Sequence, residues 1–395
     1  MAIVTYFLGD CPGCGGKEQF GNIDVRGTYI LRGCSVCRYK EQVPLPPIQK
    51  KILYLDQFFL SHAFRGAEEL FVEAAERIME LASQQVLSVP YSSIHEDETH
   101  QWERYADLLD FIKSTSRGHE FSPAYDVESI QLEKAFEAWL ASKPAAYIRE
   151  NRDAFDDDIH IWESYFRIEV GRYLGDVELI RDSKEKSVEG LVGLFKEWRQ
   201  SATSFEDDVL SEHKGAVNGY WQMFGHYQKR LAQGDLNALI DSPVKSMIVK
   251  RLFNRFPDDV PEDQRLGKVA EFLTSEHFRQ TPYQDLSSRI FAGLKAMVKE
   301  GAYTNRQNAL KNLSGFFFDV QHIATYAPYC DAIIVDKPMG HLVARQDVAI
   351  SNRYDVRVFS RNNWDEMLSW FDELEASITL EHKQALANAY PGVLR

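Results

Sequence analysis

The apolar positions of this chain fall into a few short runs, which predict strands, and many longer stretches with helical spacing. Four short runs predict strands: 51–56, 85–90, 332–335 and 355–359. Apolar residues at helical spacing follow the first run from about 57 to 82. The order strand, helix, strand, helix that begins at residue 51 is typical of a parallel sheet.

Between the second and third predicted strands the apolar residues recur only at helical spacing, which predicts a large all-helical insertion. A length of 395 residues agrees with two or three domains. The stiff segment Val43-Pro-Leu-Pro-Pro-Ile48 marks a boundary near 44–50. The expected parts are a small cysteine-bearing module, the first half of an α/β core, the helical insertion and the second half of the core, at 1–45, 51–100, 101–304 and 305–395.

Four of the five cysteines form two Cys-x-x-Cys pairs, Cys11-Pro-Gly-Cys14 and Cys34-Ser-Val-Cys37, which are separated by nineteen residues. This spacing predicts a structural Zn²⁺ site with four thiolate ligands and no open coordination position. Two short alternating segments around Gly27 lie between the pairs, so the module resembles a zinc ribbon. Nucleic-acid contact, protein docking and support of the fold all remain open as its role. Cys330 is expected to be a buried small apolar residue.

Acidic residues mark the ends of the predicted strands. Asp56 ends the first strand, Asp336 follows the third, and Asp319 lies one helix earlier. Ligands bind at the carboxyl edge of parallel sheets, so we expect these side chains to meet in one cleft. Clustered buried carboxylates repel one another unless they share protons or bind cations. The sequence therefore predicts a Mg²⁺ or Mn²⁺ site suited to phosphodiester hydrolysis.

A further carboxylate is expected from the segment that follows the second strand. Glu96 is the preferred ligand there and Glu98 the alternative; His95 and His100 are five residues apart, which does not fit a zinc-protease helix. Asp331 ranks below Asp319 and Asp336, because it can start the third strand at the opposite edge. A helix N-cap is the structural alternative for Asp56, and a turn is the alternative for Asp336.

Net charge limits the partners that the whole chain can attract. The chain carries −14, which disfavours general coating of nucleic acid, whereas residues 1–51 have seven basic and four acidic residues and a net charge of +3. No apolar run is long enough for a membrane helix, and the N-terminus lacks the basic region of a signal peptide. The expected location is the cytoplasm. Nucleotide-binding glycine loops and serine-hydrolase elbows are absent from the sequence.

These features together resemble a PIN-like nuclease. The resemblance covers 51–100 and 305–375 and rests on Leu55-Asp56, Glu96, Asp319-Val-Gln-His322 and the Asp331–Asp336 segment. It implies an α/β fold in which a PIN-like parallel sheet is interrupted by a large helical insertion, a departure from the usual family length. It also implies metal-dependent hydrolysis of RNA or single-stranded DNA, with RNA favoured. Asp56 and Asp336 would hold the ions, Glu96 and Asp319 would complete the set, and His322 would orient a carboxylate or pack in its helix.

Two other classes of protein remain open. The first is a non-catalytic adaptor, in which a zinc ribbon and a helical body dock other proteins and the carboxylates are vestigial. The second is a helical di-iron carboxylate protein, which would use an Asp-x-x-His pair within a bundle. In either case, a protein partner or a second copy of the chain is expected to contact the ribbon or the helical insertion.

Overall fold

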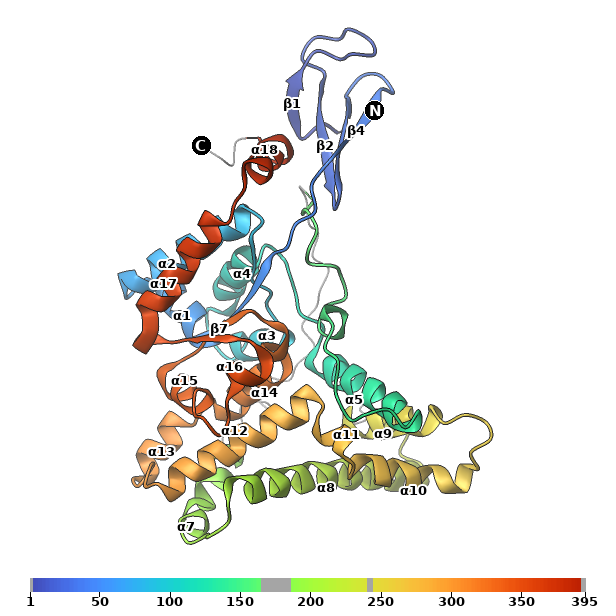
Figure 1. Cartoon of the computed structure of the whole chain (residues 1–395), viewed down its shortest axis with the longest axis vertical. Coiled ribbons are helices and arrows are strands. Elements are labelled where there is room, and N and C mark those ends of the chain that lie inside the picture. The colour runs from blue at the N-terminus through green and yellow to red at the C-terminus, as the bar shows by residue number, and fades with distance from the viewer. Residues whose placement is uncertain (1–2, 165–185, 240–243, 392–395) are drawn as a thin grey trace.

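The computed structural model of the chain describes residues 3–164, 186–239 and 244–391. It is an α/β structure with two four-stranded sheets, an antiparallel one near the N-terminus and a parallel one in the body. Figure 1 shows the antiparallel sheet projecting from one end of a largely helical body. Among the described residues, no helix combines the length and apolar character needed to cross a membrane.

The antiparallel sheet contains the cysteine pairs. Its strands, in spatial order, are β1 (Tyr6–Gly9), β2 (Phe20–Arg26), β3 (Tyr29–Cys34) and β4 (Lys40–Pro44). The expected pair around Gly27 is β2 and β3, and β1 and β4 extend it on both sides. Gly21 permits the close approach of β1, because a Cβ there would lie 1.9 Å from the Tyr6 carbonyl oxygen.

The parallel sheet combines strands from the beginning and the end of the body's sequence. Its spatial order is β6 (Leu87–Ser88), β5 (Lys51–Leu55), β7 (Ala332–Ile334) and β8 (Arg357–Phe359), and every pairing is parallel. Leu53 pairs with Ala332, so strands far apart in sequence lie side by side at the centre of the sheet. The strands are shorter than the apolar runs that predicted them, since the flanking residues form turns and helix caps.

Alternation along β5 separates two apolar cores. Leu53 and Leu55 face the core formed with α1 (Gln57–Arg65), α2 (Glu69–Ser83), α4 (Tyr105–Thr115) and α17 (Trp364–Ala376). Ile52 and Tyr54 face the core formed with α12 (Pro282–Lys299), α14 (Phe316–Tyr326) and α15 (Lys337–Val343). By the same alternation Asp56 belongs to the face that bears Tyr54.

The helical segment has its own core and is also packed against the α/β core. Phe136, Tyr220 and Phe272 are fully buried among α5 (Ala124–Leu140), α8 (Phe205–Ala232), α9 (Val244–Asn254), α10 (Glu262–Leu273) and α11 (Glu276–Arg279). Within the predicted insertion, α12 adds Ile290 and Leu294 to the core on the Tyr54 face. The boundary expected near 304 therefore follows a helix that contributes to the α/β core.

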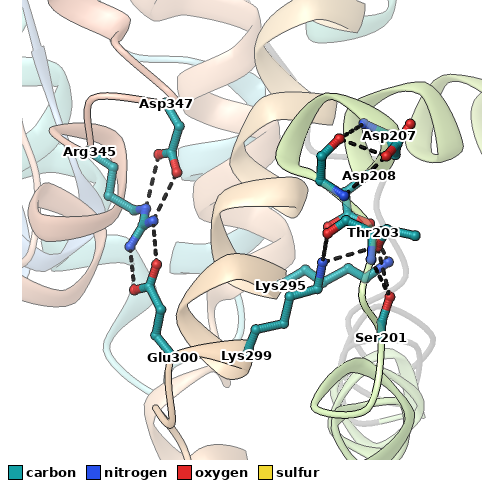
Figure 2. Close-up of polar contacts among 10 residues, drawn as sticks. Ser201, Thr203, Asp207, Asp208, Lys295, Lys299, Glu300, Arg345 and Asp347 are labelled. Carbon is teal, nitrogen blue, oxygen red and sulfur yellow. Dashed lines mark hydrogen bonds and ion pairs between the residues drawn. The ribbon is translucent and has the colours of Figure 1, made fainter.

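Buried ion pairs hold α12 in place (Figure 2). Asp208 of α8 is 1% exposed, and its two oxygens lie 2.6 Å from Lys295 and Lys299 of α12. Beyond the end of α12, Arg345 bridges Glu300 and Asp347. These contacts link the helical segment to the second half of the α/β core.

Several short elements complete the chain. They are α3 (Ser93–Thr99), η1 (Asn151–Asp153), α7 (Phe195–Trp198), η2 (Leu236–Leu239), α13 (Arg306–Asn312), η3 (Ala327–Tyr329), α16 (Ile350–Tyr354), η4 (Arg361–Asn363) and α18 (Leu380–Ala389). Gly315 is at the N-cap of α14, between α13 and α14.

The cysteine-bearing sheet is packed against the body rather than tethered to it. Val25 and Ile30 share an apolar cluster with Trp162 and with Leu386 of α18. Gly27 forms an isolated bridge with Trp162, whose indole nitrogen donates to the Pro46 carbonyl at 2.7 Å. The proline-containing segment therefore lies within a packed junction between the ribbon, residues 159–164 and the C-terminal helix.

Candidate functional site

The four clustered cysteines form a site for a metal ion. The Sγ atoms of Cys11 and Cys37 are 3.7 Å apart, and those of Cys14 and Cys34 are 3.9 Å apart. A tetrahedral ion with bonds of about 2.3 Å to sulfur requires about 3.8 Å between ligands. All four are free thiols. This arrangement suits a structural metal such as Zn²⁺.

Backbone amides support the sulfur atoms. The amides of Val36 and Cys37 both donate to the Cys34 sulfur at 3.4 Å, and the Gly13 amide donates to Cys11. The Cys37 amide bond is the main cause that lowers the pKa of Cys34 to about 7, against the opposing effect of burial. Stabilised thiolate is the form that binds metal.

A second candidate site lies at the carboxyl edge of the parallel sheet, where Asp56 follows β5. Asp56 is 5% exposed and sits at the N-cap position of α1, yet its side chain makes no capping hydrogen bond. Burial, followed by the negative charges of Glu98 and Asp336, raises the pKa of Asp56 to about 8, against the lowering effect of the Gln57 and Asp336 backbone amides. The ionised form of a carboxyl placed in this way is disfavoured.

Tyr54 lies beneath Asp56 on the same face of β5. Its hydroxyl is buried and has no hydrogen-bond partner in the described structure. Burial raises the pKa of Tyr54, followed by the charges of Asp56, Glu98 and Asp319. The hydroxyl therefore stands close to three carboxylates at once. The i, i+2 alternation of strand residues was the sequence signal for this position, and the sequence-based set omitted it.

Two of the glutamates in α3 have different surroundings. Glu98, the alternative ligand, lies beside Asp56 and places Oε2 3.6 Å from Nε2 of His322. Glu96, the preferred ligand, lies 3.6 Å from the ammonium of Lys113 instead. The two glutamates are two positions apart on α3, so their side chains point to different sides of the helix. The structure thus brings Glu98, and not Glu96, into the group around Asp56.

Asp336 and Asp319 flank the group. Asp336 caps α15, with Oδ1 accepting from the Met339 amide at 2.8 Å, while burial raises its pKa. It therefore has the helix-capping role of the structural alternative and also contributes charge beside Asp56. Asp319 is half-buried in the first turn of α14, one turn before His322.

Asp331 lies at the opposite edge of the sheet. Its Oδ2 accepts from the Ile52 amide at 2.8 Å, and its Oδ1 lies 2.6 Å from the Lys51 ammonium. Asp331 immediately precedes β7, whereas Asp336 follows it, so the strand separates the two carboxylates. The structure does not bring Asp331 together with Asp56.

Two buried histidines, His95 and His322, lie next to the acidic group. His95 is held between the Leu55 carbonyl, 2.8 Å from Nε2, and the Ser92 amide, which donates to Nδ1 at 3.0 Å. His322 is fully buried, and its ring is tilted against those of His95 and Tyr54, with ring centres 4.6 and 5.4 Å away. Burial lowers the pKa of each imidazole to about 3, so both are neutral at physiological pH.

The donor atoms of this acidic group fit a hard cation, although the carboxylates are widely spaced. Carboxylate oxygens are the donors that Mg²⁺ and Mn²⁺ prefer. Among the described residues, only the cysteines include three or more potential ligands whose atoms all lie within 4.8 Å of one another. The acidic group is therefore wider than one closed coordination shell. Mg²⁺ commonly keeps several waters and uses one or two carboxylates, so a wide arrangement is compatible with it.

Comparisons with known proteins provide no family for this chain. A scan against protein-family models, a search of curated proteins and a search of solved structures each found no match. The function of this chain is therefore inferred from the residues and geometry described above.

Proposed function

We propose that this chain is a Mg²⁺- or Mn²⁺-dependent nuclease with a PIN-like core, and that RNA is its favoured substrate. The observation that carries the proposal is the position of Asp56. It is buried at the carboxyl edge of a parallel sheet, and this burial, followed by the charges of Glu98 and Asp336, raises its pKa to about 8. Such an arrangement destabilises an idle fold and suits a cation.

The side chains have distinct roles in this proposal. Asp56 and Glu98 hold the ion, with Asp336 and Asp319 on either side. His322 places its Nε2 3.6 Å from Oε2 of Glu98, and α15 fixes Asp336 through the Met339 amide. When bound, Mg²⁺ or Mn²⁺ lowers the pKa of a bound water and neutralises charge on the phosphate.

The cysteine site has a separate role. We assign it to structural Zn²⁺, because four thiolates saturate a tetrahedral ion and leave no position for substrate. The proposed nuclease therefore contains two metal sites with different ligands. Zn²⁺ organises the ribbon, whereas the hydrolytic ion belongs to the carboxylates at the sheet edge.

The direct test measures cleavage of end-labelled RNA and single-stranded DNA by the purified chain with Mn²⁺. We expect cleavage by the wild type and its loss in Asp56→Asn, which keeps the shape of the side chain and removes its charge. The matched control is Asp331→Asn, which changes the same group at the opposite edge of the sheet and should retain cleavage. Equal cleavage by Asp56→Asn and wild type would reject the assignment of this site.

A non-catalytic adaptor is the second candidate, and the exposed edge of the ribbon favours it. Strand β1 is an edge strand, and Tyr6, Phe7 and Leu8 are 41%, 51% and 44% exposed. Exposed apolar residues on an edge strand commonly mark a protein contact. Absence of cleavage with both Mg²⁺ and Mn²⁺, together with unchanged stability on adding either ion, would favour the adaptor.

A further inference from the structure

A cluster of arginine and aromatic side chains lies on the surface near the acidic group. Phe64 and Arg65 come from the end of α1, Trp102 and Arg104 come from the segment that joins α3 to α4, and Tyr105 is the first residue of α4. We call these five residues the arginine–aromatic patch. The Arg65 guanidinium lies 5.3 Å from the centre of the Trp102 ring, and that of Arg104 lies 5.5 Å from Phe64.

The aromatic side chains of the patch are partly exposed, and the guanidinium groups of Arg65 and Arg104 both lie over the Trp102 ring, at 5.3 and 6.0 Å from its centre. Trp102 meets Phe64 edge-on, at 5.9 Å between ring centres and an interplanar angle of 87°, and both rings are half-buried. Tyr105 is 43% exposed. A rigid aromatic ring with an accessible face is a platform on which an unpaired base stacks.

The arginines of the patch are available to an anion. In the part of the chain that the structure describes, Arg65 has no carboxylate within ion-pair distance. Arg104 pairs with Asp107 at 2.8 Å, but both side chains are more than half exposed, at 64% and 57%. An exposed pair of this kind contributes about 0–1 kcal/mol, so a phosphate can replace the carboxylate with little loss.

Short contacts connect the patch to the acidic group. Gln57, the residue after Asp56, donates from Nε2 to Oγ1 of Thr99 at 3.0 Å. Thr99 ends α3, the helix that carries Glu98, and its carbonyl accepts from the Trp102 amide at 3.0 Å. The patch is therefore linked through Thr99 to the helix that carries Glu98 and to the residue that follows Asp56.

We propose that the arginine–aromatic patch binds single-stranded nucleic acid through phosphate contacts to Arg65 and Arg104 and base stacking on Trp102 and Tyr105. This inference rests on the proposed nuclease function and adds the form of its substrate. Paired bases are already stacked within a duplex, so aromatic platforms select unpaired strands. Because the whole chain carries −14, binding depends on a few local cations and not on a general basic field.

The test separates binding from cleavage by working in the Asp56→Asn background with Mg²⁺. Fluorescence anisotropy would measure the affinity for labelled ten-nucleotide oligouridylate and oligothymidylate over a range of salt concentrations. Each phosphate contact contributes about 0.7 to the slope of log K against log salt for single strands. We therefore expect Arg65→Ala to reduce the slope by about 0.7 for whichever of the two oligonucleotides the patch binds.

The aromatic contact has a different expected signature. Trp102→Leu should weaken binding by roughly 5- to 100-fold with an unchanged salt slope, because stacking carries no counterion release. Trp102→Phe keeps a ring and should recover most of the affinity. The control Lys383→Ala removes one exposed charge from α18 and should leave both quantities unchanged.

The outcomes decide the inference independently of catalysis. Equal slopes in Arg65→Ala and Lys383→Ala, or wild-type affinity in a folded Trp102→Leu variant, would overturn the patch. Binding to neither strand would overturn it as well. A preference for one strand identifies RNA or DNA as the partner and supports the patch. Cleavage by the chain with Asp56 intact is scored separately, so the nuclease can fail while the patch stands, and the reverse.

Discussion

At the scale of single residues, the alternation of β5 explains the acidic group. Tyr54 and Asp56 are two positions apart, so both point to the face that α14 covers, where His322 is buried. The same alternation directs Leu53 and Leu55 into the opposite core. One residue of register therefore decides whether this carboxylate meets Glu98 or the apolar core that contains Leu53 and Leu55.

The two glutamates of α3 provide a matched residue-scale prediction. Glu98→Gln should reduce Mn²⁺-dependent cleavage by at least the roughly 10- to 100-fold that loss of a supporting partner causes. Glu96→Gln should change cleavage little, because its neighbour is the Lys113 ammonium. Cleavage rates measured beside circular dichroism spectra check both variants. Equal losses in the two variants would remove the basis for choosing Glu98.

Asp56 also predicts an effect on stability. In the absence of divalent ions at pH 7, Asp56→Asn should unfold at a higher temperature than wild type, because the buried Asp56 carboxyl, whose pKa is raised to about 8, must take up a proton on folding and the asparagine need not. Mn²⁺ should raise the unfolding temperature of wild type, since a ligand that binds the folded state stabilises it, and should have little effect on the variant. Differential scanning fluorimetry measures both. An unchanged wild-type unfolding temperature at saturating Mn²⁺ contradicts the site.

At the scale of elements, the start of β5 is anchored by a buried ion pair. Lys50 precedes the strand with a fully buried side chain, and its ammonium lies 3.0 Å from Glu163. Glu163 also lies 2.8 Å from Arg117 and 2.7 Å from His119. The same carboxylate thus joins the linker after the ribbon, the segment after α4 and residues 159–164.

We expect Glu163→Gln to lower the free energy of unfolding by about 3 kcal/mol, because it leaves the Lys50 ammonium buried beside a neutral group. Burial opposes ionisation of Glu163, but the His119 hydrogen bond and the charges of Lys50 and Arg117 hold its pKa below the usual value. This stabilisation is therefore fully present above the unfolded-state pKa of about 4.3 and is lost progressively as the pH falls from there toward the lowered folded-state pKa.

Urea unfolding at pH 7 and at pH 4 checks the Glu163 prediction, and the difference between variant and wild type should shrink at the lower pH. The matched control is Asp372→Asn, which breaks a surface pair with Arg77 in which Asp372 is 76% exposed. It should change stability by less than about 1 kcal/mol. Similar losses in the two variants would show that the Glu163 pair is no more than a surface contact.

The elements also show what the sequence predicted well. The zinc-ligand spacing, the parallel strands and the position of Asp56 at a strand end follow from local pattern, because each depends on residues close in sequence. The choice between Glu96 and Glu98 depends on Lys113 and His322, which come from other helices. The four-stranded form of the ribbon likewise requires β1, whose apolar residues face solvent and gave no periodic signal.

At the scale of the whole molecule, the ribbon and the body share one apolar cluster. Trp162 and α18 pack directly on Val25 and Ile30, and Asn22 donates to the Asn388 carbonyl at 2.7 Å. Loss of the ribbon metal is therefore expected to affect the C-terminal helix as well as residues 3–45. The acidic group lies at the sheet edge and shares no member with this cluster.

Cys14→Ser should lose Zn²⁺ and increase hydrogen exchange across the ribbon and across α18. Because the acidic group is built by other elements, Mn²⁺ binding should persist, as isothermal titration would show. Exchange resolved by peptide mass spectrometry provides the map, and Cys330→Ser, outside the cysteine cluster, is the control. Loss of Mn²⁺ binding in the Cys14→Ser variant alone would show that the two sites depend on each other.

The pairing of β5 with β7 has a consequence for the synthesis of the protein on the ribosome. Leu53 and Ala332 are 279 positions apart. At 5–20 residues per second, synthesis separates them by about 14 to 56 s. For most of that interval Asp56 and Glu98 have been synthesised, whereas Asp319, His322 and Asp336 are made only near or after its end. A nascent or truncated chain therefore lacks half of the acidic group, and any hydrolytic activity would begin only after translation is nearly finished.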